Sequence, residues 1–245
     1  MMRHPDWIVP DWPAPANVKS LITTRAGGAS SGSFASFNLG LRTNDDPHAV
    51  AENRARLRAL LPQEPRWLRQ VHGASVVDAD VAAGAPEADA SVARHVGTVC
   101  AVMVADCVPV LFTDRAGTQV AIAHAGWRGL AAGVIENTVR SLGLAPGELL
   151  AYLGPGIGPR AFEVGADVRD AFLERDARAT AAFKPHTAGK WLADLSLLVR
   201  QRLLNAGINR IYGGGLCTYS DAARFYSYRR DKVTGRMAAL IWRAE

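Results

Sequence analysis

Cys107 and His124, two residues able to do chemistry, flank a segment whose pattern predicts a β-hairpin. Residues 108–113 and 118–123 are apolar and rich in β-branched side chains, which favours strands. Residues 114–117 between them form a polar turn that ends in glycine, a hairpin signal. The hairpin would therefore bring the two ends of the segment together.

The expected register places these two residues opposite each other. If Thr113 pairs with Thr118, antiparallel pairing also puts Cys107 opposite His124, with Cβ atoms about 5 Å apart. Pro109 can introduce a bulge that slips this register by one residue. A thiol and an imidazole so placed can share one metal ion or form a nucleophile–base pair.

His72 is the third candidate. Like His124, it ends an apolar run that reads as a strand and is followed at once by small residues, which let a ligand approach closely. His4, His48 and His186 are expected to have surface roles. Two histidines and Cys107, all at strand ends, therefore indicate a site.

A His/Cys/His set leaves a fourth tetrahedral position open, the pattern of catalytic zinc. The gaps of 35 and 17 residues match no short zinc motif, and the signature of zinc cytidine-type deaminases is absent. Without metal, Cys107 is a nucleophile and His124 its base, as in cysteine hydrolases. The same ligands suit a blue-copper site with Met103 as axial ligand, but six histidines are too few for a multicopper oxidase.

Two neighbours of these residues each have more than one possible role. Asp106 adjoins Cys107 and either orients a ligand, acts as a base or caps a turn. Arg128 precedes an expected helix and either binds a phosphate or anionic intermediate or forms a surface salt bridge.

The composition is that of an ordinary folded protein. Of its 245 residues 49% are hydrophobic and 21% charged. No apolar run approaches the roughly 18 residues needed to span a membrane, and the N-terminal segment lacks the apolar core of a signal peptide. The net charge of +5 is scattered and no nucleic-acid-binding signature is present, and three cysteines without paired spacing exclude a disulfide framework. We expect a cytoplasmic protein with neither a membrane nor a nucleic-acid partner.

The order of elements predicts one mixed α/β domain. Residues 1–17 read as an extended arm, and residues 18–245 as the domain. Strands are expected at 18–24, 66–71, 75–80, 99–104, 108–113, 118–123, 149–153, 209–213, 225–230 and 237–242. Helices are expected at 48–61, 130–142, 164–173 and 192–204.

An ordered set of motifs resembles the YfiH-like laccase-domain family. The resemblance covers residues ~20 to 242, and the motifs read TRAGG (24–28), NLG (38–40), DDP (45–47), ENR (52–54), QVHG (70–73), ADA (88–90), DCVP (106–109), HAGWRG (124–129), GPGIGP (154–159), FEVG (162–165) and YSYRR (226–230). The resemblance implies an α/β sandwich like a bacterial toxin's cysteine-hydrolase domain. It also implies a zinc site from His72, Cys107 and His124.

The resemblance further implies a purine nucleoside enzyme in a family long labelled polyphenol oxidase. The implied reactions are phosphorolysis of adenosine, inosine, guanosine and 5′-methylthioadenosine, and deamination of adenosine. Copper oxidation of phenols, cysteine hydrolysis or peptidoglycan-precursor editing, and non-enzymatic metal binding remain alternatives. We expect purine nucleosides and inorganic phosphate as partners, and a monomer or small homo-oligomer.

A hypothesis for the reaction assigns further residues. Phosphate would lie on basic groups and backbone amides and attack the ribose C1′ as the purine leaves. In deamination, a zinc-activated water would attack the purine C6, with Asp106 or Asp89 moving protons. The full set of substrate and phosphate candidates is Arg25, Gly27, Gly28, Asn38, Arg42, Asp89, Arg128 and Arg229.

Overall fold

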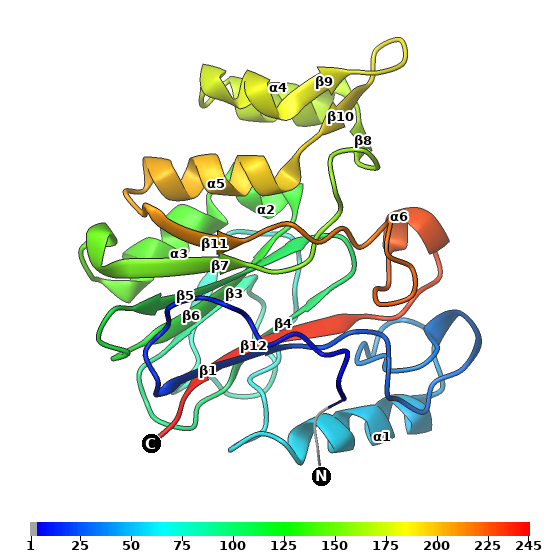
Figure 1. Cartoon of the computed structure of the whole chain (residues 1–245), viewed down its shortest axis with the longest axis vertical. Coiled ribbons are helices and arrows are strands. Elements are labelled where there is room, and N and C mark those ends of the chain that lie inside the picture. Colours follow the sequence, from blue (N-terminus) through cyan, green and yellow to red (C-terminus); the bar gives the residue numbers. More distant parts are fainter. Residues whose placement is uncertain (1–3) are drawn as a thin grey trace.

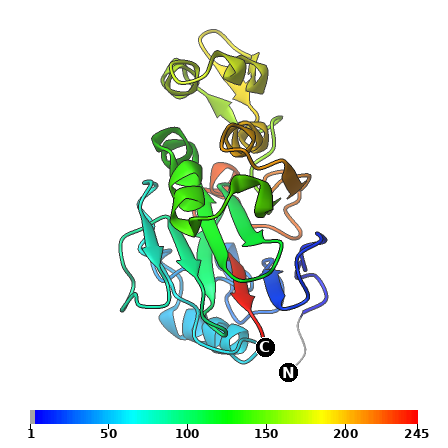
Figure 2. The same ribbon diagram turned by 90° about the vertical axis from the view of Figure 1, so that its left-hand side faces the viewer.

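Two β-sheets packed face to face, with helices on their outer sides, form the layers of the fold (Figure 1). The computed structural model describes residues 4–245. One face of a six-stranded sheet is covered by helices α2, α3 and α5, and the other by a three-stranded sheet, with α1 beyond it. A small sheet with α4 lies at one end of the molecule, beyond α5 (Figure 2). The prediction of a mixed α/β sandwich with outer helices is confirmed.

The strands fall into three sheets. The six-stranded sheet has the order β11 (Arg210–Gly213), β7 (Leu149–Leu153), β5 (Val108–Asp114), β6 (Val120–Ala125), β3 (Ala90–Ala93) and β2 (Val76–Asp78). The three-stranded sheet has the order β1 (Val18–Ile22), β12 (Met237–Arg243) and β4 (Cys100–Val104). The small sheet has the order β8 (Glu163–Val164), β10 (Trp191–Ala193) and β9 (Phe183–Pro185). Parallel and antiparallel pairs occur together in the six-stranded sheet.

The helices connect these strands. The α-helices are α1 (Pro47–Arg58), α2 (Trp127–Ala132), α3 (Val134–Leu142), α4 (Ala166–Leu173), α5 (Leu195–Asn205) and α6 (Tyr228–Asp231). Short 3₁₀ helices are η1 (Gly32–Phe34), η2 (Pro146–Glu148) and η3 (Ala177–Ala182). None of the helices within residues 4–245 has the length and apolarity needed to cross a membrane.

Strands β5 and β6 are buried on both faces, which explains their nearly continuous apolar sequences. Alternate residues of each strand, such as Phe112 of β5 and Ala123 of β6, pack against the helices. The residues between them, such as Leu111 of β5 and Ile122 of β6, face the three-stranded sheet. The opposite face of that sheet packs on α1 through Leu57 and its neighbours.

The predicted register of the β5–β6 hairpin is wrong by two residues. Val120, not Thr118, pairs with Thr113, and His124 lies opposite Pro109. The reason is Asp114: its carboxylate accepts hydrogen bonds from the backbone N–H groups of Thr118 and Gln119, at 2.8 and 3.0 Å. The turn is therefore longer than the sequence pattern indicates.

Other element predictions need correction. The helix expected at 130–142 begins at Trp127 and breaks into α2 and α3 at Gly133, whose φ of 101° is left-handed. Residues 225–230 do not form a strand, because Ser227 accepts a hydrogen bond from the Arg230 N–H and caps the short helix α6. Residues 66–71 make isolated bridges rather than a strand, and β3 was not predicted.

Candidate metal site

His72, Cys107 and His124 converge at one end of the six-stranded sheet. Their ligand atoms all lie within 4.8 Å of one another, and the imidazole ring centroids of His72 and His124 are 4.9 Å apart. His124 is buried, Cys107 half-buried and His72 exposed. Within residues 4–245 this is the one cluster of three or more such side chains able to hold a metal ion.

The predicted register of β5 and β6 is wrong by two residues, but the predicted convergence of Cys107 and His124 is still observed. Side chains in a strand alternate between faces, so a slip of two keeps every side chain on its original face. Cys107 lies just before β5, two residues from Pro109, which is opposite His124. Cys107 is therefore a diagonal rather than a direct neighbour of His124, still within reach of its ring.

Asp89 holds two of the three residues in place. It precedes β3, and the β3–β6 register sets it beside His124, whose backbone N–H donates to the Asp89 carbonyl. Its fully buried carboxylate lies 2.8 Å from Nδ1 of His124. The same carboxylate accepts hydrogen bonds from the backbone N–H groups of Val71, His72 and Gly73, at 3.1, 3.0 and 2.7 Å.

This arrangement is that of a metal-ligating histidine with a carboxylate behind it. Because Asp89 occupies Nδ1 of His124, Nε2 is the nitrogen left for a cation. The Asp89 oxygens are occupied by protein donors. Asp89 therefore positions His72 and His124 and does not contact substrate. Burial raises the pKa of Asp89, but the hydrogen bonds from His124 and Gly73 outweigh it and lower that pKa overall.

Cys107 and His124 shift each other's pKa toward the charged forms. Burial raises the pKa of the Cys107 thiol, but the charge and hydrogen bonds of His124 and His72 outweigh it and lower that pKa to about 6. Burial lowers the pKa of His124, but Cys107 and Asp89 outweigh it and raise that pKa to about 9. A thiolate beside an imidazolium results, and a thiolate is the form that ligates metals.

Two turns with left-handed backbone aim the ligands. His72 has a φ of 60° and Asp106 a φ of 95°. The Asp106 carboxylate accepts hydrogen bonds from the Thr218 hydroxyl and from the backbone N–H of Arg229, each at 2.7 Å. Asp106 therefore ties the segment of Cys107 to the loop that carries Thr218 and to helix α6.

Gly126 lies opposite Cys107 and leaves the space that the ligands occupy. A Cβ atom there would lie 2.8 Å from Sγ of Cys107 and 3.0 Å from Cδ2 of His72. The φ of Gly126 is −76°, so only these contacts, and not the backbone, require glycine.

We expect Gly126→Ala to weaken metal affinity about tenfold or more, because the added methyl displaces ligands from their geometry. The free energy of unfolding should change by no more than about 1 kcal/mol. Metal titration and denaturant unfolding measure the two quantities. Gly147→Ala, where a Cβ meets no atom within 4 Å, is the matched control; equal affinities for both variants would refute the steric argument.

The loop expected to hold phosphate uses its groups within the protein. The backbone N–H of Arg25 donates to the Arg224 carbonyl, and that of Gly28 to the Ser36 hydroxyl. The Arg25 guanidinium donates to the carbonyls of Ala35 and Ala222. These contacts fold the loop and leave few of its donors for a ligand.

The other candidates of this region are likewise engaged or peripheral. Asn38 is fully buried, and its amide donates to Thr43 and Asp45 and accepts from the N–H groups of Gly40 and Arg236. Gly27 has a φ of 96° and packs against His4. Arg42 is exposed.

Arg128 and Arg229 lie next to the trio in sequence or by contact. Arg128 is exposed at the second residue of α2, and its guanidinium is 4.5 Å from the centroid of Trp127. Arg229 contacts Asp106 through its backbone and donates from its guanidinium to the Glu163 carbonyl at 2.7 Å. The Arg229 guanidinium is therefore engaged by a backbone carbonyl, and the Arg128 guanidinium lies over a tryptophan ring.

Sequence reasoning missed two residues of this region. Gln70 exchanges hydrogen bonds with the backbone of Met103, at 2.9 and 2.7 Å, and fixes the segment leading to His72. Arg236 is close enough for the charges of Cys107 and Asp106 to raise its pKa, although its burial lowers that pKa by more. The GR dipeptide at 235–236, before an apolar strand, was the available signal.

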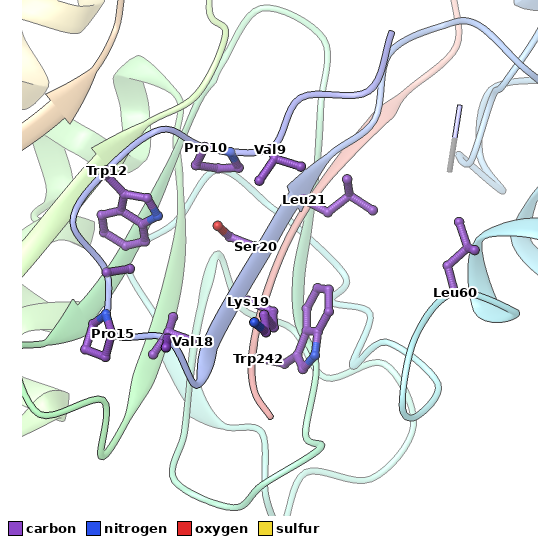
Figure 3. A pocket seen from close by; sticks show the side chains of 12 residues that line it. Val9, Pro10, Trp12, Pro15, Val18, Lys19, Ser20, Leu21, Leu60 and Trp242 are labelled. Atoms are coloured by element: carbon purple, nitrogen blue, oxygen red, sulfur yellow. The ribbon is translucent and has the colours of Figure 1, made fainter. Parts of the chain in front are cut away.

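Two pockets lie apart from the trio. One of about 460 Å³ is bordered by Trp12, Ser20 and Trp242 beside the edge of β1 (Figure 3). Another of about 390 Å³ is bordered by Cys217, Arg160 and Arg200. Neither is lined by His72, Cys107 or His124.

The chain is similar to known proteins over nearly its whole length. A family model described as multi-copper polyphenol oxidoreductase laccase matches residues 19–244. A Pseudomonas aeruginosa protein named purine nucleoside phosphorylase is 56% identical over 237 residues, covering 96% of this chain and 98% of that protein. The Escherichia coli purine nucleoside phosphorylase YfiH is 55% identical over 241 residues, with the same coverage.

Solved structures share the whole fold. A Neisseria meningitidis protein superimposes with a TM-score of 0.95 and 51% identity, covering 98% of this chain and 100% of that one. YlmD from Geobacillus stearothermophilus gives a TM-score of 0.88 at 34% identity, covering 94% and 93%. The fold and the His/Cys/His cluster define a laccase-domain protein. The chain belongs to the YfiH-type branch of that family.

Proposed function

We propose that this chain is a zinc-dependent purine nucleoside phosphorylase. The observation that carries the proposal is the convergence of His72, Cys107 and His124 above Asp89, in a chain 55% identical to a protein of that name. Phosphorolysis of adenosine, inosine, guanosine and 5′-methylthioadenosine, and deamination of adenosine, are part of the proposal.

The residues present fit a zinc ion. One thiolate and two imidazoles are its preferred donors, and Gly126 leaves the space around them open. Copper accepts the same donors, but the Met103 sulfur, its axial candidate, lies 3.8 Å from the Arg54 guanidinium. A cationic neighbour disfavours that sulfur as a ligand to a cation. We therefore favour zinc, which would supply Lewis-acid polarisation of the substrate when bound.

The protein's own residues do the remaining work. In phosphorolysis the C1′–N9 bond of the nucleoside breaks, a C1′–O bond to phosphate forms, and the departing purine takes up a proton. Arg128, four residues after His124, and Arg229, whose backbone N–H donates to Asp106, add positive charge to this region. Asp89 fixes the orientation of the His124 ring and the place of His72.

The test is metal quantification combined with a nucleoside panel, with and without phosphate. We expect about one zinc per chain and release of free purine that requires phosphate and yields ribose 1-phosphate. Conversion of adenosine to inosine without phosphate tests the deamination separately. A protein that holds metal but turns over no purine nucleoside would instead support the non-enzymatic metal-binding alternative.

The affinity for zinc should rise with pH between about 6 and 9. In this range the free site holds a Cys107 thiolate and a protonated His124, whose pKa values are about 6 and 9. Binding must displace the His124 proton, so affinity should increase about tenfold per pH unit. Calorimetric titration in buffers of different ionisation enthalpy counts the released proton; an affinity independent of pH would contradict the ion pair.

A cysteine hydrolase is the second candidate, because Cys107, His124 and Asp89 also have the geometry of nucleophile, base and orienting group. Chelation separates the two candidates. Nucleoside phosphorolysis should stop when the metal is removed and return with zinc, whereas a thiol nucleophile would act without metal and be blocked by alkylation. Alkylation-sensitive hydrolysis by metal-free protein would favour the second candidate.

A further inference from the structure

We propose that Arg236 binds the phosphate of this reaction, with Arg54, which is hydrogen-bonded to the same residue Leu39, as a second source of positive charge. The inference rests on the proposed function and identifies where in the protein its inorganic co-substrate is held. Both residues lie outside the region formed by the loop 25–28 and Arg42, where the sequence pattern predicts the phosphate.

The sheet register brings Arg236 to the metal ligands. Met237, the first residue of β12, pairs with Val104, the last residue of β4. One step further along this antiparallel pair, Arg236 comes opposite Ala105, two residues before Cys107. The charges of Cys107 and Asp106 accordingly act on the Arg236 guanidinium.

The segment that carries Arg236 is held tightly. Its backbone N–H donates to Asn38 Oδ1 at 2.8 Å, and its carbonyl accepts from the Leu39 N–H at 3.1 Å. Gly235 packs against the Tyr226 ring, where a Cβ would meet ring atoms at 2.7 Å. The Asn38 side chain, predicted to contact substrate, thus serves to position Arg236.

The guanidinium is oriented but not saturated. One terminal nitrogen, Nη1, donates to the carbonyls of Thr234 and Gly235, each at 3.0 Å. In the described part of the chain, Nε and Nη2 of Arg236 have no hydrogen-bond acceptor. The Thr234 hydroxyl, on a residue only 3% exposed, also lacks a partner there. A polar ligand at this loop would satisfy both groups.

Arg54 lies on the other side of the same residue, Leu39. Its Nε donates to the Leu39 carbonyl at 2.9 Å, while the Leu39 N–H donates to Arg236. Its Nη2 contacts the Met103 sulfur, and its guanidinium lies 4.4 Å from the centroid of the Trp67 ring. The Arg54 side chain and the Arg236 backbone are therefore both hydrogen-bonded to Leu39.

Negative charges act on both arginines without direct contact, from Glu64 on Arg54 and from Cys107 and Asp106 on Arg236. Among residues 4–245, neither arginine forms an ion pair with a carboxylate. Burial is the main cause that lowers the pKa of each guanidinium, so both charges are partly desolvated. Arginine is seldom buried without an anion, and its planar fork matches the oxygens of phosphate. Inorganic phosphate is the anion that the proposed reaction requires.

The test compares Arg236→Gln, Arg236→Lys and Arg54→Gln with Arg140→Gln, an exposed arginine on α3. We expect Arg236→Gln to raise the KM for phosphate about 10- to 100-fold, with the KM for inosine and the zinc content unchanged. Arg236→Lys should recover part of the loss, because it restores the charge without the fork. Arg54→Gln should act in the same direction and less strongly, and Arg140→Gln should match the unmodified protein.

A second measurement needs no turnover. Phosphate alone, without nucleoside, should raise the melting temperature of the zinc-loaded unmodified protein and not that of the Arg236→Gln variant. Absence of phosphorolysis in the unmodified protein would refute the proposed function and leave this binding result to be judged separately. An unchanged phosphate KM and an unchanged phosphate-induced shift in Arg236→Gln would overturn the inference, and a raised phosphate KM in Arg42→Gln instead would return the phosphate to the loop.

Discussion

Replacing Cys107 by alanine should abolish both stoichiometric zinc and phosphorolysis. The residue supplies one of three protein ligands, and it is the one that is negatively charged when the metal binds. Structural zinc sites gain roughly 10–16 kcal/mol from their ligand sets, so loss of one ligand should weaken zinc binding by on the order of a thousandfold. Competition titration against a chromophoric chelator measures the affinity, and purine release measures the activity.

Cys217→Ala is the matched control for this variant. Cys217 is also a half-buried thiol whose sulfur accepts backbone hydrogen bonds, including one from the Gly158 N–H at 3.1 Å, but it is not in the cluster. It should retain zinc and activity. Full activity in metal-free Cys107→Ala would remove this residue from both the metal and the nucleophile mechanisms.

Asp89→Asn should lower both metal affinity and stability. The buried carboxylate accepts three backbone hydrogen bonds and contacts the His124 ring, whereas an asparagine would turn an NH₂ group toward N–H donors. We expect zinc affinity to fall about 10- to 100-fold, as for other partners of metal-bound histidines. The free energy of unfolding of the metal-free protein should fall by about 3 kcal/mol, because buried donors lose their acceptor.

The dependence of stability on pH identifies the cause. The pKa of Asp89 is lowered in the folded protein, so its contribution is present above the unfolded value of about 3.9 and is lost as pH falls through the folded value. The free energy of unfolding of the Asp89→Asn variant should therefore lack the part that the unmodified protein loses when Asp89 is protonated at low pH. A variant as stable as the unmodified protein at neutral pH, with the same acid profile, would contradict the positioning role.

The main elements of the fold were predictable because their patterns are local. Alternating or continuous apolar runs gave most of the strands around the site, and helix α5 was expected from its apolar spacing. The register of β5 and β6 was not predictable, because it depends on how the Asp114 side chain binds the turn. The prediction that Cys107 and His124 converge was nevertheless correct, because the error in the predicted register was an even number of residues.

The metal ligands and the phosphate candidates differ for a physical reason. Histidine and cysteine at strand ends have few structural uses that require their chemistry, so their types indicate a site. Asn38 and Gly28 belong to a loop whose polar groups bind one another, and a sequence does not show which partner a polar group takes. The place of Arg236 and the positioning role of Asp89 become recognisable only when distant strands are placed side by side.

The carboxylate of Asp89 binds residues 71–73 through their main-chain N–H groups alone. These hydrogen bonds do not depend on the side chain at residue 72. That position is also the most exposed of the three, and its left-handed backbone is one that aspartate and asparagine adopt readily. An aspartate or asparagine in place of His72 would therefore offer the metal an oxygen ligand instead of a nitrogen ligand. Such an exchange would change which ion is preferred without changing the fold around the site.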